Sequence, residues 1–182
     1  GYFPELTVKF IYNKDFAATN NAYSLLLAKE SIKGEFILLD SDIVFHEEIL
    51  ALLKKFPERP ALAVERHACG EEEIKVTVDS KQRIGAINKQ VEPSLAWGES
   101  IGIEIFSAAA KEKLFQVLEK RIRQEKRVNE YYEASFEEMI NDGFPFYAVD
   151  TSAYPAMEVD FSEDLEAARK MEQQIKASTG HK

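Results

Sequence analysis

Hydrophobic and polar residues follow two different periods along this chain. Short apolar or alternating runs, bounded by Gly, Pro, Asn or Asp, predict strands. These runs are Leu6–Tyr12, Phe36–Leu39, Ala61–Val64, Glu73–Val78, Arg83–Ile87, Trp97–Phe106, Phe146–Val149 and Met157–Asp160. Longer stretches with a polar cap and an apolar stripe predict helices. These stretches are Ala22–Glu30, Glu47–Phe56, Ser107–Arg127, Asn129–Asn141 and Ser162–Lys176.

Two of the alternating runs lie unusually close together. Only Asp79-Ser80-Lys81-Gln82 separates Glu73–Val78 from Arg83–Ile87. So short a polar link predicts a β-hairpin at the edge of a sheet rather than another βα unit. Gly98 and Gly102 fall inside the strand predicted next, and glycine within a strand often marks a close approach by another group.

The run Phe36–Leu39 leads directly into Asp40-Ser41-Asp42. Four large apolar residues in succession are typical of a central parallel strand that is covered on both faces. Ligands of open α/β sheets bind beyond the carboxyl ends of such strands, and a period of two places Asp40 and Asp42 on the same side. Two carboxylates with no basic neighbour favour a divalent metal, held together with a phosphate-bearing substrate. The same residues also fit a plain turn or the cap of the next helix.

Composition narrows the classes of function. The 182 residues are enough for one domain, 1–182, and 23 Lys and Arg against 32 Asp and Glu give a net charge of −9. An acidic chain argues against a nucleic-acid partner. The single cysteine, Cys69, excludes an internal disulfide and indicates a cytoplasmic protein, and no apolar run approaches the roughly 20 residues of a membrane span. No spacing among His46, His67 and His181 indicates a zinc site, and Cys69 has no visible partner.

Three short motifs follow one another along the chain. They are Asn20-Asn21-Ala22-Tyr23-Ser24-Leu25, Asp40-Ser41-Asp42 and Glu158-Val159-Asp160. In this order and spacing they resemble the sugar-phosphate nucleotidylyltransferases, most closely the phosphocholine cytidylyltransferase-like branch. The match spans Tyr12 to about Ala168. The resemblance implies an α/β fold with a mixed, mainly parallel sheet and helices on both faces, into which the β-hairpin is inserted.

The resemblance also implies an activity. A nucleoside monophosphate, CMP from CTP in the closest branch, is transferred to a phosphorylated alcohol such as phosphocholine or a sugar phosphate, and pyrophosphate is released. Asp42 and Asp160 match the Mg²⁺ ligands, and Lys89 matches the cation that faces the substrate phosphate. The nucleotide side comprises Asn20, Asn21 and Ser24, with Asp40 as a neighbouring acid. The acceptor side comprises Glu99, Tyr131, Tyr132, Glu133 and Glu158, and the two tyrosines would cage a quaternary ammonium group such as choline.

One part of the family pattern does not occur in this sequence. The family begins with a glycine-rich G-x-G-x-R loop and a lysine, which wrap the triphosphate. Gly1-Tyr2 resembles the end of the second βα unit of such enzymes. We therefore expect the chain to be an N-terminally incomplete piece that lacks about 60 to 70 residues and is inactive or weakly binding by itself.

Two other functions fit the same residues. A metal-dependent glycosyltransferase holds a nucleotide-sugar through an Asp-x-Asp motif, but more often uses a histidine where this chain has Asp160. A non-catalytic sensing or scaffold domain would keep the sheet without the phosphate loop. The acceptor, the base and the oligomeric state remain open.

Overall fold

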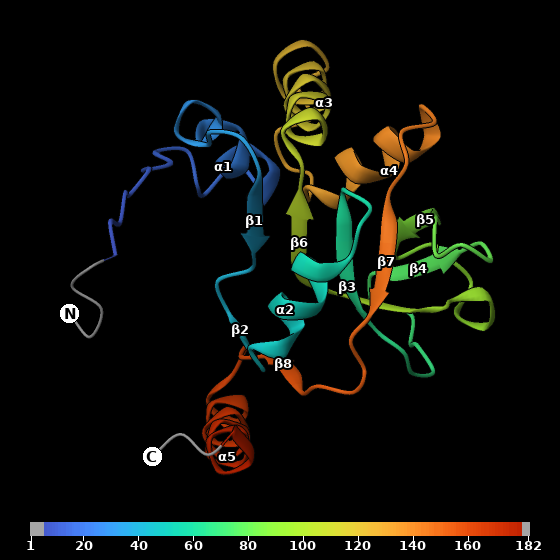
Figure 1. Cartoon of the computed structure of the whole chain (residues 1–182). Coiled ribbons are helices and arrows are strands. Elements are labelled where there is room, and N and C mark those ends of the chain that lie inside the picture. Colours follow the sequence, from blue (N-terminus) through green and yellow to red (C-terminus); the bar gives the residue numbers. More distant parts are fainter. Residues whose placement is uncertain (1–5, 180–182) are drawn as a thin grey trace.

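The computed structural model describes residues 6–179, whose strands form two sheets (Figure 1). The strands are β1 Phe36–Leu39, β2 Ile43–Phe45, β3 Ala61–Glu65, β4 Lys75–Val78, β5 Ile84–Asn88, β6 Gly98–Phe106, β7 Tyr147–Asp150 and β8 Ala156–Glu158. The α-helices are α1 Asn21–Leu27, α2 Glu48–Lys55, α3 Ala108–Glu119, α4 Glu133–Asn141 and α5 Ser162–Thr179. Short 3₁₀ turns cover Lys29–Ser31 and Pro93–Leu95, and a π-helical turn, Lys120–Gln124, continues α3.

The long strand β6 organises the larger sheet. Strand β3 pairs along one edge of β6, from Ala61 opposite Ile105 to Glu65 opposite Glu99. Strands β1 and β4 therefore share the other edge: β1 pairs with Ile103–Phe106, and β4 pairs with Gly98 and Glu99. The end of β1 and the start of β4 leave Ser100 to Gly102 of β6 uncovered by a paired strand. A gap in the sheet thus lies where Asp40 follows β1.

The predicted mixed sheet with helices on both faces is confirmed, but its pairings differ from a mainly parallel sheet. Among the described strands, only β3 and β7 pair in parallel, while β6 runs against β1, β3 and β4. The reason is that the chain passes from β3 to β6 through the predicted hairpin of β4 and β5, without a crossover helix. Strand β1 is consequently an antiparallel edge strand of the described sheet, with Leu39 43% exposed, and not a central parallel one.

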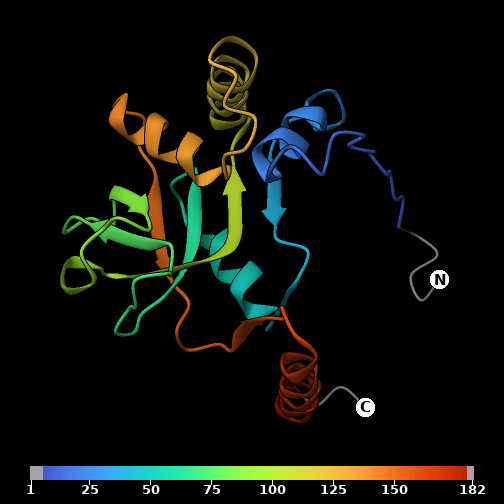
Figure 2. The same ribbon diagram turned by 180° about the vertical axis from the view of Figure 1, so that it is seen from behind.

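Successive hydrophobic side chains along the strands point to opposite faces of the sheet, where they form two separate cores. Leu62 and Val64 of β3 face the core beneath α1, α3 and α4, whereas Ala61 and Ala63 face the core beneath α2. Ile101, Ile103 and Ile105 share the α2 face, as the sequence pattern predicts. The two views of the ribbon show these helices on opposite sides of the strands (Figure 1, Figure 2).

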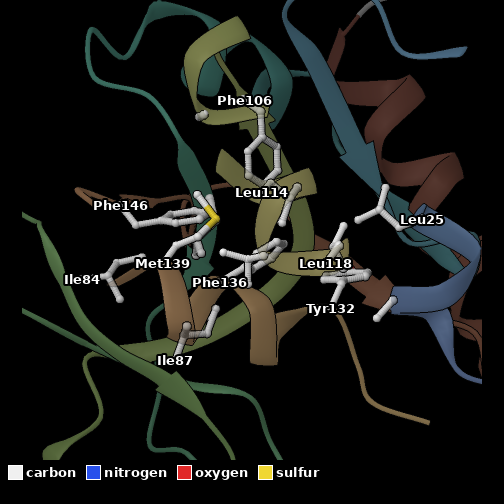
Figure 3. Packing of buried hydrophobic residues seen from close by; sticks show 14 of the residues in the cluster. Leu25, Ile84, Ile87, Phe106, Leu114, Leu118, Tyr132, Phe136, Met139 and Phe146 are labelled. Atoms are coloured by element: carbon white, nitrogen blue, oxygen red, sulfur yellow. The ribbon is translucent and has the colours of Figure 1, made fainter. Parts of the chain in front are cut away.

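Aromatic rings fix α4 against the sheet (Figure 3). The centroid of Phe106 lies 5.5 Å from that of Phe136 and 5.7 Å from that of Phe146, and the last two rings are 5.2 Å apart. Tyr132, just before α4, packs 5.1 Å from Phe136. Offset and edge-on rings at such separations attract one another beyond their area of contact. This packing places the start of α4 beside the gap in the sheet.

Some predicted elements differ in the structure. Residues 6–12 form no strand, and Leu6, Val8 and Phe10 are largely exposed, because alternation alone does not create a strand without a neighbouring strand to pair with. The helix predicted from Asn129 begins at Glu133. The short strand β2 was not predicted; it pairs with β8 in a separate two-stranded sheet.

Gly102 is held at a φ of +67°, and a Cβ atom there would collide with the Asp40 carboxylate. Gly143 also has a positive φ, +83°, but a Cβ atom there would meet nothing within 4 Å. We expect Gly143→Ala to lower the free energy of unfolding by about 1 kcal/mol, from backbone strain alone, and Gly102→Ala by about 3 kcal/mol. Urea unfolding of the two variants measures the difference. Equal losses would show that Asp40 moves aside freely.

Candidate functional site

A hollow of about 360 Å³ occupies the gap between β1 and β4. Ser100 and Gly102 of β6 form part of its floor, between the strand ends. Carboxylates dominate the rest of the lining: Asp40, Asp42, Glu72, Glu73, Glu99, Glu133 and Glu158. Asn21, Lys89 and Tyr131 supply other polar groups. So many acids around one lysine create a site that favours cations, or anions that arrive with a cation.

Asp40 is fixed from two directions. Its backbone N–H donates to the Gly102 carbonyl (3.0 Å), and its Oδ1 accepts a hydrogen bond from the Tyr132 hydroxyl (2.7 Å). Burial raises the pKa of Asp40; the Tyr132 hydrogen bond lowers it, and the nearby charge of Asp42 raises it further. Burial likewise raises the pKa of Tyr132, so its hydroxyl stays protonated as the donor. Asp40 therefore joins the sheet to α4.

The predicted Asn-Asn motif is divided between two tasks. Asn21 lines the hollow, and its Oδ1 accepts a hydrogen bond from the Tyr132 backbone N–H (2.9 Å). Asn20 caps α1, accepting from the Asn21 backbone N–H (2.8 Å), and does not line the hollow. Ser24 also lies outside the lining, and its hydroxyl accepts from Asn13 Nδ2 (3.0 Å). Of the three residues, only Asn21 is placed to meet a ligand in this hollow.

The second and third motifs lie side by side. Strands β2 and β8 pair with Ile43 opposite Glu158, and the Val159 N–H donates to the Asp42 carbonyl (2.8 Å). Burial raises the pKa of Glu158, and the charges of Asp160, Asp42 and Asp40 raise it further. Asp42 and Glu158 line the hollow, whereas Asp160, two residues before α5, is exposed and is not among the residues that line it. Segments more than a hundred residues apart in sequence thus bring their acids together.

The sequence did not predict that a buried carboxyl group, Glu104, lies close to a half-buried one, Glu133. Glu104 of β6 is fully buried, and neither of its oxygens has a hydrogen-bond partner among the described residues; the same holds for Oε2 of Glu133. Burial, with the charges of Glu133 and Asp40, raises the pKa of Glu104 well above its ordinary range. Burial raises the pKa of Glu133 to about 7; its own backbone hydrogen bond and Lys89 oppose the rise, while Asp40 and Glu158 add to it. Burial therefore favours the neutral acid at Glu104, and Glu133 changes its charge near neutral pH.

The remaining predicted residues separate into exposed and buried ones. Lys89 is partly exposed, borders the hollow and forms an ion pair with Glu72 (3.4 Å). Tyr131 is 56% exposed and borders both this hollow and an adjoining one of about 670 Å³. Tyr132 is only 2% exposed and its hydroxyl is bound to Asp40, so the predicted cage of two tyrosines does not form. Packing against Phe136 of α4 buries Tyr132, so of the two tyrosines Tyr131 is the exposed one.

Glu99 also lines the hollow, where its Oε2 lies 3.1 Å from Nε2 of His67. Burial and the charge of Glu73 raise the pKa of Glu99, and the contact with His67 opposes this rise. Burial lowers the pKa of His67, but hydrogen bonds to Ala68 and Glu99 and the charges of Glu73 and Glu99 outweigh it, so this pKa is raised.

Comparison with known proteins places this geometry in context. Over 90% of this chain, the inositol-1-phosphate CTP transferase of T. maritima superposes with a TM-score of 0.71 at 19% identity, with 65% of that chain covered. The CTP:phosphocholine cytidylyltransferase of Streptococcus pneumoniae superposes over 93%, with a TM-score of 0.72 at 17% identity and 71% of its chain covered. The chain has the nucleotidyltransferase fold. The predicted resemblance is thereby confirmed at the level of the fold.

Curated sequences agree with the nucleotidyltransferase fold. A bifunctional IPC transferase and DIPP synthase of Aquifex aeolicus is 30% identical over 153 residues, which are 82% of this chain and 32% of that protein. A CMP-5'-(3-aminopropyl)phosphonate synthase of Streptomyces rubellomurinus is 33% identical over 66 residues, 36% of this chain and 10% of that protein. The chain spans a third or less of these relatives. No family model matches it.

Among the described residues, no helix has both the length and the apolar composition of a membrane-spanning helix.

The raised pKa of Glu133 gives a prediction for stability. An acid whose pKa is higher in the folded state binds more protons when folded, so the free energy of unfolding falls as pH rises from about 4.5 to about 7 and stays lower above. Glutamine mimics the protonated acid. Between pH 5 and pH 8, the free energy of unfolding of Glu133→Gln should therefore fall by about 2 kcal/mol less than that of the wild type. Urea unfolding at both pH values measures this. Parallel pH profiles would contradict a raised pKa of Glu133.

Proposed function

We propose that this chain supplies the metal- and acceptor-binding part of a CTP-dependent nucleotidyltransferase that transfers CMP to a phosphorylated alcohol and releases pyrophosphate. The observation that carries the proposal is the pairing of β2 with β8, which places Asp40, Asp42 and Glu158 in the lining of one hollow, with Asp160 two residues beyond Glu158. The names of relatives and structural neighbours that act with CTP or form a CMP product support the choice of cytidine.

The donor set fits Mg²⁺. Asp42 and Asp160 offer carboxylate oxygens, which this hard cation prefers, and the substrate phosphates would complete the coordination. Among the described residues, neither these two acids nor Glu158 has an ion-pair partner. Burial raises the pKa of Glu158, and the charges of Asp160, Asp42 and Asp40 raise it further, so a cation would relieve the repulsion among these acids. When bound, Mg²⁺ would neutralise charge on the triphosphate.

The other residues of the site position two anions. The acceptor phosphate is already an anion, so its oxygen can form the bond to the α-phosphorus as the bond to pyrophosphate breaks, and no general base is needed. Within residues 6–179, the ion-pair partner of Lys89 is Glu72, whose side chain is 94% exposed, and such a surface pair is weak. Its ammonium group can therefore turn to a substrate phosphate. The Oδ1 of Asn21 accepts from the Tyr132 backbone N–H, so in this proposal its amide N–H groups would donate to the nucleotide.

The adjoining hollow is the proposed acceptor pocket. It shares Ile74, Lys89, Tyr131 and Glu133 with the first hollow, so a phosphate near Lys89 could have its alcohol portion in the larger space. The exposed ring of Tyr131 offers one aromatic face, which favours a positively charged acceptor such as phosphocholine through a cation–π contact.

Pyrophosphate release tests the proposed function. The full-length gene product is supplied with CTP, Mg²⁺ and, in turn, phosphocholine, inositol phosphate, a sugar phosphate and an aminophosphonate. We expect pyrophosphate with at least one acceptor. A glycosyltransferase, which uses the same Asp-x-Asp motif, would release none. Absence of CTP binding by calorimetry to both this chain and the full-length product would favour a non-catalytic scaffold instead.

Asp42→Ala provides the sharper prediction. If Asp42 holds the metal at the triphosphate, turnover should fall about 10³-fold or more while the fold persists, because the charge stabilisation of the transition state is lost. Steady-state pyrophosphate release measures turnover, and circular dichroism checks the fold. Glu47→Ala is the matched control, since Glu47 is exposed and lies outside the hollow. Full turnover of the Asp42 variant would remove Asp42 from the mechanism.

A further inference from the structure

A second group of ligand-type side chains lies at the rim of the hollow, in the link between β3 and β4. A nitrogen of His67, the sulfur of Cys69 and a carboxylate oxygen of Glu73 lie within 4.8 Å of one another. Glu99 adds a fourth group, with Oε2 at 3.1 Å from Nε2 of His67. Residue spacing does not predict this group, because the fourth residue comes from β6, 26 positions beyond Glu73.

We propose that His67, Cys69, Glu73 and Glu99 form a binding site for a zinc-like divalent cation. Imidazole nitrogen, thiolate sulfur and carboxylate oxygen are the donors that Zn²⁺ takes in four-coordinate sites. Magnesium prefers oxygen alone, so this site would differ in metal from the acids at Asp42 and Asp160. In a tetrahedral site, nitrogen and sulfur ligands lie about 3.6 Å apart, so the group needs to contract by only about 1 Å to close on a cation.

The backbone around these residues is already held in place. Lys75 is fully buried, and its Nζ donates to the carbonyls of Gly70 (3.1 Å), Glu71 (2.8 Å) and Glu73 (3.2 Å). The Gly70 N–H in turn donates to Oε2 of Glu73 (2.7 Å). A loop folded before the metal arrives loses less conformational entropy on binding, which favours affinity.

The start of the loop is fixed as well. The Arg66 N–H donates to the Ser152 hydroxyl (2.7 Å), and its guanidinium lies 5.0 Å from the centre of the Trp97 ring. Arg66 is therefore fixed, and it limits the movement of His67, which follows it in the chain.

Charge at the cluster favours a cation. Glu73 and Glu99 bring two carboxylates to one imidazole and one thiol. The side chain of Lys75, in the following strand, donates to three carbonyl groups rather than to either carboxylate. Because Glu73 and Glu99 also line the hollow between β1 and β4, a cation here would fix one wall of that hollow. The site does not depend on the function proposed above.

Cobalt(II) is the probe for this site, since it occupies zinc sites and absorbs light. We expect the purified chain to bind one Co²⁺ with a sulfur-to-cobalt charge-transfer band, and Zn²⁺ to displace it. Cys69→Ser should abolish the band and weaken Zn²⁺ binding about 100-fold or more. Glu73→Gln keeps an acceptor for the Gly70 N–H and should weaken binding at least about 10-fold.

Two control variants distinguish this site from metal binding elsewhere on the chain. Glu72→Gln changes the adjacent, exposed glutamate and should leave the Co²⁺ spectrum and Zn²⁺ affinity unchanged. Asp42→Asn should also leave them unchanged if the two metal sites are distinct. Thermal unfolding checks that each variant is folded. A Co²⁺ complex without the sulfur band, or Zn²⁺ binding that survives Cys69→Ser and is lost in Asp42→Asn, would overturn the proposal.

Discussion

Two strands share one edge of β6, and the interval between them determines where chemistry can occur in this protein. Because β1 ends opposite Ile103 and β4 begins opposite Glu99, the intervening residues of β6 are free to form the floor of a hollow. Every side chain with a proposed role there depends on this interval. Asp40 and Asp42 follow β1, Glu73 precedes β4, and Glu99 belongs to β6 itself.

Many carboxylates line the hollow between β1 and β4, and their mutual repulsion is reduced in several ways. Asp40 accepts a hydrogen bond from a buried tyrosine, Glu99 contacts a histidine, and burial raises the pKa values of Glu104 and Glu133. Asp42, Glu158 and Asp160 have no such compensation among the described residues. Cations reduce the repulsion in such a site, so both proposals involve a metal ion. The two metals differ in the ligand atoms that they prefer.

Local patterns in the sequence were sufficient for most of the secondary structure and for the resemblance. The hairpin of β4 and β5, the shared face of Ile101, Ile103 and Ile105, and the serine cap of α3 all follow from short-range rules. Strand direction did not follow, because an apolar run such as Phe36–Leu39 is the same in parallel and antiparallel pairs. Residues 6–12 alternate like a strand, yet pairing depends on a neighbour that alternation cannot reveal.

The parts of the candidate site that escaped prediction depend on contacts between distant segments. Tyr132 and Asp40 are 92 residues apart in the sequence. The hydrogen bond from the Tyr132 hydroxyl to the Asp40 carboxylate follows only from the packing of α4 against the sheet. Glu104 resembles a solvent-facing residue among isoleucines, but the face on which it lies is covered. His67, Cys69 and Glu99 lie in a loop and a strand, and their convergence has no signature in spacing.

The two faces of β6 carry different kinds of side chain, and this difference has an evolutionary consequence. Its successive residues alternate between an isoleucine face and a face bearing Ser100, Gly102 and Glu104, so insertion or deletion of a single residue would exchange the two sets. Such a slip would bury polar groups among hydrocarbon and expose the isoleucines to the ligand at the same time. Length variation among descendants of this chain should therefore accumulate in its loops, while β6 changes only by substitution.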